Sequence, residues 1–224
     1  MNRRLLLIAE NIENSLGFVD VGTDHGYLPV YMAQNGYSGK IYASDINLDP
    51  LKKAIKHAAD NGLEDRISFS LADGLHSCPK DEIDTIVIAG MGGDMILKIL
   101  DETEWCMSDK YKLILQPMSK SEVLRYWLVY NEFEINTEIL VDENNTIYQI
   151  IVARFGGNTK LNDAELFIGK KDLAADAELY RKQFENYKKR FTRAISDMSN
   201  SATAPQHRVQ LFKEIYQQLE EMES

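Results

Sequence analysis

The segment Phe18–Pro29, with the sequence Phe-Val-Asp-Val-Gly-Thr-Asp-His-Gly-Tyr-Leu-Pro, constrains the fold more than any other part of this chain. It predicts a short buried strand that turns through two glycines, four residues apart, into a helix. Glycine lets a backbone approach a ligand closely because it has no Cβ. The first turn of a helix offers unpaired N–H groups. This order of elements is typical of a nucleotide-cofactor site.

Short apolar runs alternate with helical patterns along the first two thirds of the chain. We expect strands over residues 18–21, 41–44, 67–71, 84–89, 112–115, 133–141 and 147–155. We expect helices over residues 3–16, 26–35, 49–61, 93–100 and 119–130, the last opened by a capping box of Ser119 and Glu122. Asn144 and Asn145 suit a hairpin turn between the last two strands.

This alternation predicts an α/β fold of the Rossmann-like type. Five β-α repeats followed by a hairpin give a seven-stranded, mostly parallel sheet with helices on both faces and an antiparallel last strand. Ligands of such sheets bind beyond the carboxyl ends of the strands, where the strand order reverses. We therefore expect the functional residues at strand ends.

A second unit is predicted after Gly157. From Leu173 to Met198 apolar residues recur at alternating steps of four and three, which is a heptad pattern. A turn-forming segment follows, and a second apolar stripe runs from Val209 to Leu219. We interpret residues 1–157 as the catalytic domain and residues 158–224 as a coiled-coil helical hairpin.

Charge and cysteine content narrow the classes of protein. Residues 1–157 hold 14 Lys and Arg against 24 Asp and Glu, so the net charge of −10 lies there, while residues 158–224 hold 11 of each. Two cysteines and four scattered histidines predict neither a disulfide framework nor a metal site. The N-terminal apolar run is too short for a signal peptide, and no run is long enough to span a membrane. We expect a cytoplasmic protein, a monomer or weak homodimer.

Asp24 distinguishes between the possible cofactors. The dinucleotide pattern G-x-G-x-x-G needs a glycine where a pyrophosphate passes, whereas this chain has Asp24 in the turn between Gly22 and Gly26. A carboxylate there would repel phosphates. S-adenosylmethionine has no phosphate and carries a sulfonium and an ammonium, so it fits better than NAD.

Acidic residues end three successive strands. Asp45 is placed to accept both ribose hydroxyls, and Asp73 with Gly74 to bind the adenine amino group. Each acid alone could equally cap a helix or stabilise a turn, but the three together with the glycine turn favour a cofactor site. The predicted cofactor-binding residues are Asp20, Gly22, His25, Gly26, Tyr27, Asp45, Ile46, Asp73, Gly74, Ala89 and Gly90.

Three segments resemble one known family. Asp-Val-Gly-Thr-Asp-His-Gly-Tyr-Leu-Pro at 20–29, Ile-Ala-Gly-Met-Gly-Gly at 88–93 and Gln-Pro-Met at 116–118 are similar to those of the bacterial tRNA (adenine(22)-N1)-methyltransferases. The resemblance covers nearly the whole chain, since that family also carries a C-terminal helical hairpin. It implies methyl transfer from S-adenosylmethionine to ring nitrogen N1 of an adenine in the D-loop of tRNA.

Under this interpretation, three residues become candidates for catalysis. N1 of adenine has a free lone pair, so no strong base is needed, but the methylated ring is cationic. Asp24 would stabilise that charge, unless it only caps the helix behind it. The turn that contains Met91 lacks the amide and aromatic side chains of enzymes that methylate exocyclic amines. Gln116 would read the base edge.

Basic residues on the heptad helix suit contact with phosphates, because N1 lies on the pairing edge and the base must leave its stack. The predicted RNA-binding residues are Arg3, Arg4, Arg181, Lys182, Lys188, Lys189, Arg190 and Arg193. A solvated helix face is the alternative reading of this stripe. Two other functions stay open: a methyltransferase for small molecules, for which the basic helix has no purpose, and a cofactor-binding module without catalysis whose hairpin binds a protein.

Overall fold

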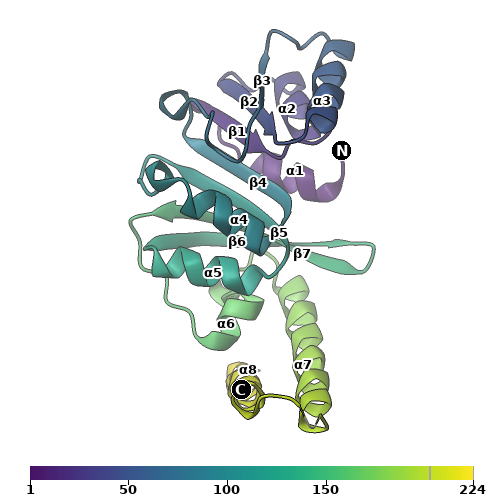
Figure 1. The fold of residues 1–224 in the computed structure, drawn as a ribbon, viewed down its shortest axis with the longest axis vertical. Coiled ribbons are helices and arrows are strands. Elements are labelled where there is room, and N and C mark those ends of the chain that lie inside the picture. The colour runs from purple at the N-terminus through teal and green to yellow at the C-terminus, as the bar shows by residue number, and fades with distance from the viewer. Residues whose placement is uncertain (202, 224) are drawn as a thin grey trace.

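The computed structural model describes residues 1–201 and 203–223 and places seven strands in one sheet (Figure 1). The order across the sheet is β3-β2-β1-β4-β5-β7-β6. The strands are β1 Gly17–Val21, β2 Lys40–Asp45, β3 Ile67–Leu71, β4 Thr85–Gly92, β5 Lys112–Ser119, β6 Phe133–Glu143 and β7 Thr146–Phe155. The helices are α1 Arg3–Glu10, α2 Tyr27–Gln34, α3 Leu48–Asp60, α4 Gly93–Asp101, α5 Ser121–Tyr130, α6 Asp163–Ile168, α7 Ala177–Ser199 and α8 Gln206–Glu223.

The sheet confirms the predicted Rossmann-like α/β fold. β1 pairs in parallel with both β2 and β4, and β7 is antiparallel to β5 and β6. Because β2 and β4 lie on opposite sides of β1, the strand order reverses there. The crevice for a ligand is therefore expected beyond the carboxyl ends of β1 and β4.

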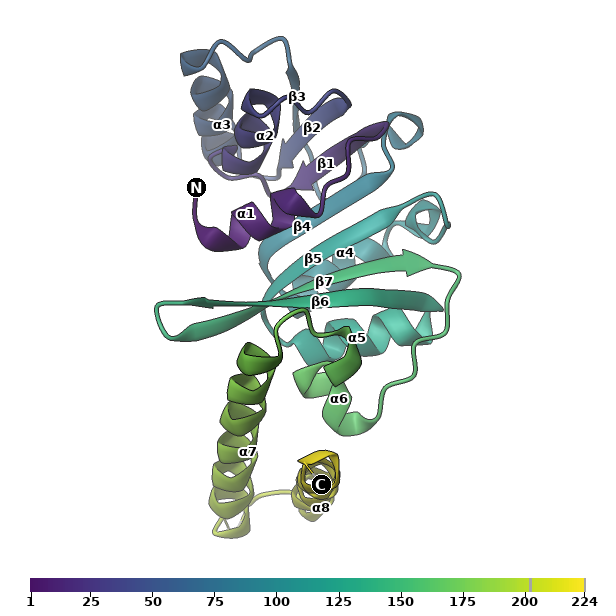
Figure 2. The ribbon, with the colours of Figure 1, turned by 180° about the vertical axis from the view of Figure 1, so that it is seen from behind.

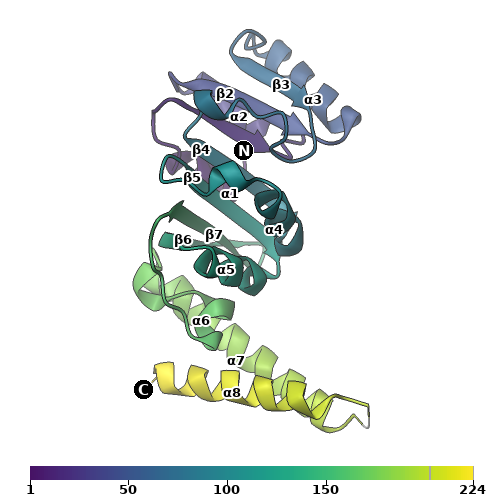
Figure 3. The same cartoon turned by 60° about the vertical axis from the view of Figure 1, so that its left-hand side comes forward.

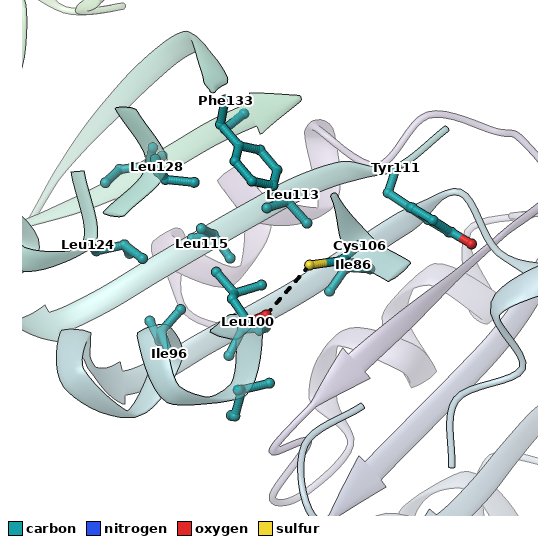
Figure 4. Packing of buried hydrophobic residues seen from close by; sticks show 14 of the residues in the cluster. Ile86, Ile96, Leu100, Cys106, Tyr111, Leu113, Leu115, Leu124, Leu128 and Phe133 are labelled. Atoms are coloured by element: carbon teal, nitrogen blue, oxygen red, sulfur yellow. Dashed lines mark hydrogen bonds between the residues drawn. The ribbon is translucent and has the colours of Figure 1, made fainter. Parts of the chain in front are cut away.

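Each face of the sheet has its own hydrophobic core, and alternation along the strands divides the side chains between them. Ile86 and Ile88 of β4 face α4 and α5, in the cluster drawn in Figure 4, where the Cys106 thiol donates to Leu100 O at 3.8 Å. Val87 faces the other core, which α1, α2 and α3 cover. Burial on both faces explains why β4 and β5 read as continuous apolar runs.

Two local predictions were wrong. The helix expected over 3–16 ends at Glu10, where the Asn11 side chain donates to Leu7 O. Ser119 is the last residue of β5 and not a helix cap, because Lys120 takes the N-cap position in the left-handed region, at φ 55°, with no side-chain capping hydrogen bond. The sequence pattern of a capping box gives no information on where the preceding strand ends, and β5 extends to Ser119.

The hairpin between β6 and β7 is confirmed and is longer than predicted. Asn144 and Asn145 both have positive φ, at 52° and 63°, as a two-residue turn with the twist of the strands requires. The paired residues reach Glu143 and Thr146, so the tip projects past the sheet beside the start of α7 (Figure 2).

The C-terminal helices form a hairpin, but its coiled-coil packing is not confirmed. In Figure 1 α8 is viewed nearly end-on while α7 runs along the page, and in Figure 3 both helices run along the page at an angle, so the two helices cross. Leu173, the first position of the heptad pattern, lies in a short 3-10 helix ahead of α7. α6 supplies Ala164 and Ile168 to the same core as Phe191 and Leu219. Both helices therefore pack against α6 as well as against each other.

Arg125 of α5 joins this helical region to the sheet. Its side chain is fully buried and donates five hydrogen bonds. Two reach the Glu138 carboxylate of β6, at 2.7 and 3.1 Å, and one reaches Gln149 of β7. The other two reach the carbonyls of Leu166 and Phe167 in α6. All five N–H groups are thus satisfied, and residues on both sides of Gly157 depend on one guanidinium.

We predict that Arg125→Met lowers the free energy of unfolding by about 3–5 kcal/mol, because it leaves the Glu138 carboxylate buried without its cation. The double variant Arg125→Met with Glu138→Leu should lose less, since no uncompensated charge remains. Urea unfolding measures both. Lys56→Met, which removes the exposed pair with Asp60, is the control and should change little. A single variant as stable as that control would contradict the prediction.

Candidate active site

The turn between β1 and α2 lies at the predicted crevice and has an unusual backbone. Gly22, Asp24 and Gly26 have φ of 73°, 51° and 67°. The N–H groups of Gly22 and Thr23 both donate to Ser44 O, at 2.8 and 2.9 Å. Asp tolerates the left-handed region better than most residues, so Asp24 keeps the glycine-like geometry of the turn and adds a carboxylate.

Both glycines of this turn also permit close packing. A Cβ at Gly26 would lie 3.0 Å from the Cβ of Ala54, so glycine lets α2 approach α3. A Cβ at Gly22 would lie 2.2 Å from the terminal methyl of Met91. The predicted catalytic Met91 thus covers the glycine turn directly, which places the β4 turn over the turn from Gly22 to Gly26.

Asp20 is a buried carboxylate beneath the turn. It is 6% exposed, and its Oδ2 accepts a hydrogen bond of 2.7 Å from the Thr23 hydroxyl. The pKa of Asp20 is raised to about 6: burial is the main cause, the Thr23 hydrogen bond acts against it, and the charge of Asp45 adds a smaller rise. The site therefore holds an acid that a nearby cation would ionise. Sequence reasoning missed Thr23, although a hydroxyl three residues after a buried acid is a usable signal.

Asp45 fastens the turn from the neighbouring strand. It is 7% exposed, and its two oxygens accept hydrogen bonds from the backbone N–H groups of Asp24, at 3.2 Å, and Asn47, at 2.8 Å. Ile46, next to it, is 60% exposed. An exposed isoleucine at the end of a buried strand offers an apolar surface for a flat ring.

Asp73 and Gly74 follow β3 at the same edge of the sheet. The side chain of Asp73 is exposed, and its carbonyl accepts the N–H and the Nδ1 of His76. Gly74 has φ of 56°, and a Cβ there would press on Ile99 of α4. Within the described residues, the contacts of Asp73 with its own loop are thus made by its carbonyl and not by its carboxylate. Gly74 allows the loop to pack closely against α4.

Asp24, His25 and Tyr27 form the outer rim of the turn. The Asp24 carboxylate is 65% exposed and lies 3.7 Å from His25 Nε2. His25 stacks on Tyr27, whose ring meets His57 edge-on. α2 has Gly26 as its N-cap with no side-chain hydrogen bond, so Asp24 does not cap that helix. This removes the structural alternative that the sequence had left open for Asp24.

The β4 turn differs from the simple turn predicted over 90–93. β4 continues to Gly92 with two irregularities in its pairing to β5, and Gly90 has φ of 81°. Ala89 pairs with Gln116 across the two strands. The Gln116 side chain is fully buried: its Oε1 accepts from Gly90 N at 3.1 Å, and its Nε2 donates to Pro117 O.

Gln116 was expected to read the base edge, but its amide is occupied at both ends. Its observed contacts instead hold the Gly90 turn in place. A sequence cannot distinguish a buried amide from an exposed one at the end of a strand, because the difference depends on what covers the strand.

The predicted RNA-binding residues are not equally available. Arg4 is half-buried: its backbone N–H donates to Glu143, its Nη1 to the Met118 sulfur, and its guanidinium covers the Tyr148 ring at 4.7 Å. Arg3 and five cations of α7 are exposed, namely Arg181, Lys182, Lys189, Arg190 and Arg193.

Three of the α7 cations have carboxylate partners. Lys182 pairs with Asp142 of the hairpin and Lys188 with Glu223 of α8. Arg193 lies 3.7 Å from Asp197, one turn further along α7. Lys182 and Lys188 therefore bind parts of this chain to each other, and an RNA phosphate would have to compete with those carboxylates.

The arrangement suits S-adenosylmethionine. Two buried acids and a left-handed glycine turn meet at the reversal of the strand order, and the exposed Asp24 adds negative charge. Such a site favours a cationic ligand without phosphates. Within residues 1–201 and 203–223, no group of three His, Cys, Asp or Glu residues is arranged to hold a metal ion, and no helix is long and apolar enough to cross a membrane.

Comparison with known proteins agrees with this chemistry. Residues 18–221 match the model of a family described as TrmK, tRNA (adenine(22)-N(1))-methyltransferase. The Bacillus subtilis tRNA (adenine(22)-N(1))-methyltransferase is 35% identical over 156 residues, which are 70% of this chain and 66% of that protein.

Two solved structures are similar along their whole length. Mycoplasma capricolum TrmK in complex with S-adenosyl-homocysteine is 30% identical, with a TM-score of 0.82 and 98% of each chain covered. Streptococcus pneumoniae Sp1610 in complex with S-adenosyl-L-methionine is 28% identical, with a TM-score of 0.81, covering 99% of this chain and 98% of that one.

The buried acid predicts a pH-dependent stability. In the unfolded chain Asp20 ionises near 3.8, whereas in the folded protein it stays protonated up to about pH 6. The folded state therefore binds more protons between these values, and its stability falls as the pH rises through them. Asp20→Asn removes this penalty and should stabilise the cofactor-free protein above pH 6 by on the order of 3 kcal/mol.

The measurement is urea unfolding of both proteins without cofactor. The gain should be complete at pH 7.5 and should shrink as the pH falls below about 6, since the wild-type carboxyl is then neutral. Asp49→Asn, an exposed residue in the first turn of α3, is the control and should show no such trend. A gain that is independent of pH would argue against the raised pKa.

Proposed function

Because this chain belongs to the tRNA (adenine(22)-N(1))-methyltransferase family, we propose that it methylates ring nitrogen N1 of adenine 22, in the D-loop of tRNA, with S-adenosylmethionine as methyl donor. The observation that carries the proposal is the turn from Gly22 to Gly26, which stands over two buried acids at the reversal of the strand order. Its negative charge suits a cationic cofactor.

The residues in and around this turn have distinct proposed roles in holding the cofactor. Asp45, whose oxygens already fasten the turn, has lone pairs left to accept the ribose hydroxyls. Asp20 is a buried carboxyl group. A positively charged cofactor nearby would favour its ionised form, which would then supply negative charge. Ile46 offers an apolar face to the adenine ring, and Asp73 with Gly74 the polar contacts at its edge. Gly22, His25, Gly26, Tyr27, Ala89 and Gly90 complete the predicted contact set.

The reaction is an in-line displacement. The bound cofactor would supply a methyl group attached to its sulfonium, and the sulfur would leave as a neutral thioether. The N1 lone pair forms the new bond to the methyl carbon while the carbon–sulfur bond breaks and its electron pair returns to sulfur. The adenine ring becomes cationic. The exposed Asp24 carboxylate is the group we propose to stabilise this charge.

The β4 turn completes the transfer site. We propose that Gln116 acts as a positioning residue, since its amide holds Gly90 and does not face a substrate. Met91, packed over Gly22, would close the site against water and align the acceptor with the methyl group.

We propose that residues 158–224 hold the tRNA, as the exposed cations of α7 suggest, with Arg3 as a further contact. The boundary after Gly157 remains a proposal. Because Arg125 donates two of its hydrogen bonds to carbonyls of α6, removal of residues 158–224 would also leave part of a buried guanidinium unsatisfied. Point variants are therefore a cleaner test than truncation. The cytoplasm, where tRNA is modified, remains the proposed location.

Incubation of the protein with labelled S-adenosylmethionine and bulk tRNA tests the proposal. We expect label in tRNA and, after digestion, on N1 of adenine 22. Label on small molecules alone would favour the small-molecule methyltransferase. Cofactor binding without any transfer would favour the non-catalytic module.

Asp45→Ala should weaken S-adenosylmethionine binding by about 10- to 100-fold, because charge-assisted hydrogen bonds to the ribose are lost. Isothermal titration calorimetry measures the change. Asp49→Ala, four residues away and exposed, is the matched control and should bind normally. Unchanged affinity in Asp45→Ala would remove Asp45 from the ribose site.

Asp24→Asn should lower kcat by roughly 10- to 100-fold while the affinity for S-adenosylmethionine changes little, because the exposed carboxylate acts on the cationic product ring. Asparagine tolerates positive φ as well as aspartate does, so the turn should keep its shape. A loss confined to cofactor affinity would assign Asp24 to the cofactor instead.

A further inference from the structure

A groove of ≈ 440 Å³ runs between the end of β5, the hairpin of β6 and β7, and α7. The loop 117–122 forms one wall and hairpin residues 145–149 another. The third wall consists of Gln183, Asn186, Tyr187 and Arg190 of α7. None of the cofactor-binding residues lines it, so it is a separate surface.

The groove begins at the end of β5, next to Gln116. Its wall begins at Pro117 and Met118, directly after Gln116, and Gln116 holds the Gly90 turn where the methyl group would be transferred. A nucleotide strand whose adenine enters the transfer site must leave that site somewhere. The groove lies along the same end of β5.

The distribution of charge favours passage of the RNA strand through this groove. The cofactor side of the site carries Asp20, Asp24, Asp45 and Asp73, and phosphates would be repelled there. The groove has Lys120 on the wall formed by the loop 117–122 and Arg190 on the wall formed by α7, and Glu122 is the one carboxylate among its lining residues. Two cations among the lining residues of one groove are suited to a phosphate.

Aromatic and amide side chains complete the lining. Arg190 covers the Tyr187 ring, with 5.8 Å from Cζ to the ring centroid, and Arg4 covers Tyr148 from behind at 4.7 Å. Both rings are half-buried and so are held in place. Asn145 and Asn186 are exposed beside them. Aromatic faces flanked by amides and cations are typical of sites for unpaired nucleotides.

Lys120 has two features that suit a binding role. It adopts the left-handed backbone region at φ 55°, which is costly for a residue other than glycine and recurs at ligand sites. Its ammonium pairs with Asp94 in the first turn of α4 while 56% of the side chain stays exposed. The ion pair fixes the position of the ammonium, and a phosphate in the groove would have to compete with the Asp94 carboxylate for it.

We propose that this groove binds the nucleotide that adjoins the target adenine in the tRNA strand, with its phosphate between Lys120 and Arg190 and its base against Tyr187. The proposal rests on the proposed function. It assigns the β5–α5 loop, the hairpin and α7 to a single subsite, which links the catalytic domain to the helical region.

The first test compares two double variants with the full-length wild-type protein. Lys120→Gln with Arg190→Gln removes both groove cations. Lys98→Gln with Arg208→Gln is the control: Lys98 is equally exposed, at 56%, and also pairs with a carboxylate, while Arg208 covers Phe212 at 5.7 Å as Arg190 covers Tyr187. The two changes therefore match in charge and in local contacts.

We expect the groove variant to lose about 10- to 100-fold in kcat/KM for tRNA methylation, mainly through KM, with unchanged affinity for S-adenosylmethionine. The dependence of its KM on salt should also weaken, because fewer phosphates are neutralised. The control should behave as the wild type does. Equal loss in both variants, or in neither, overturns the groove. No methylation of tRNA by the wild type overturns the proposed function itself, and the groove with it.

The second test addresses stacking. Tyr187→Ala should reduce kcat/KM, whereas Tyr187→Phe should retain it, because the ring and not the hydroxyl contacts the base. Urea unfolding of both variants measures how much of any loss comes from stability. If Tyr187→Phe loses as much as Tyr187→Ala, or if neither loses activity, the base does not stack on this ring.

Discussion

The parallel pairing of β1 with β2 and β4 is the constraint on which this structure depends. The carboxyl ends of parallel strands lie at the same edge of a sheet. Residues far apart in the sequence therefore meet there as a direct result of the strand pairing. Asp20, Asp45 and the Gly90 turn come together for this reason. The turn from Gly22 to Gly26 is then held by two hydrogen bonds to Ser44 O, one to Asp45 and one from the Thr23 hydroxyl to Asp20.

A second constraint is the buried Arg125. Its guanidinium binds β6, β7 and α6 at once, and a buried arginine with all its donors satisfied cannot shift without losing several hydrogen bonds. The helical region is therefore held against the sheet at a defined place. α7 lies beside the β6–β7 hairpin, where Lys182 pairs with Asp142, and the groove is lined by both elements.

Charge is distributed to match these two parts. Acids gather on the side of the sheet edge that suits a cationic cofactor, and exposed cations lie on α7 and on Lys120, toward the proposed RNA subsite. The net charge of −10 hides this separation. Two of the α7 cations make contacts within the chain. Lys182 connects α7 to the β6–β7 hairpin, and Lys188 connects α7 to α8.

The sequence by itself determined the fold, the family and the class of cofactor, because these depend on local patterns: buried apolar strands, a glycine turn, and an acid at Asp24 where phosphates would otherwise pass. It predicted the hairpin from Asn144 and Asn145 for the same reason. What it could not determine depends on which surfaces meet. Gln116 is buried under the Gly90 turn, Arg4 packs on Tyr148, and Ser119 ends a strand instead of capping a helix. A heptad pattern records which residues are apolar but not that α6 supplies part of their partner surface. Only tertiary packing decided those contacts, and with them the groove between β5, the hairpin and α7.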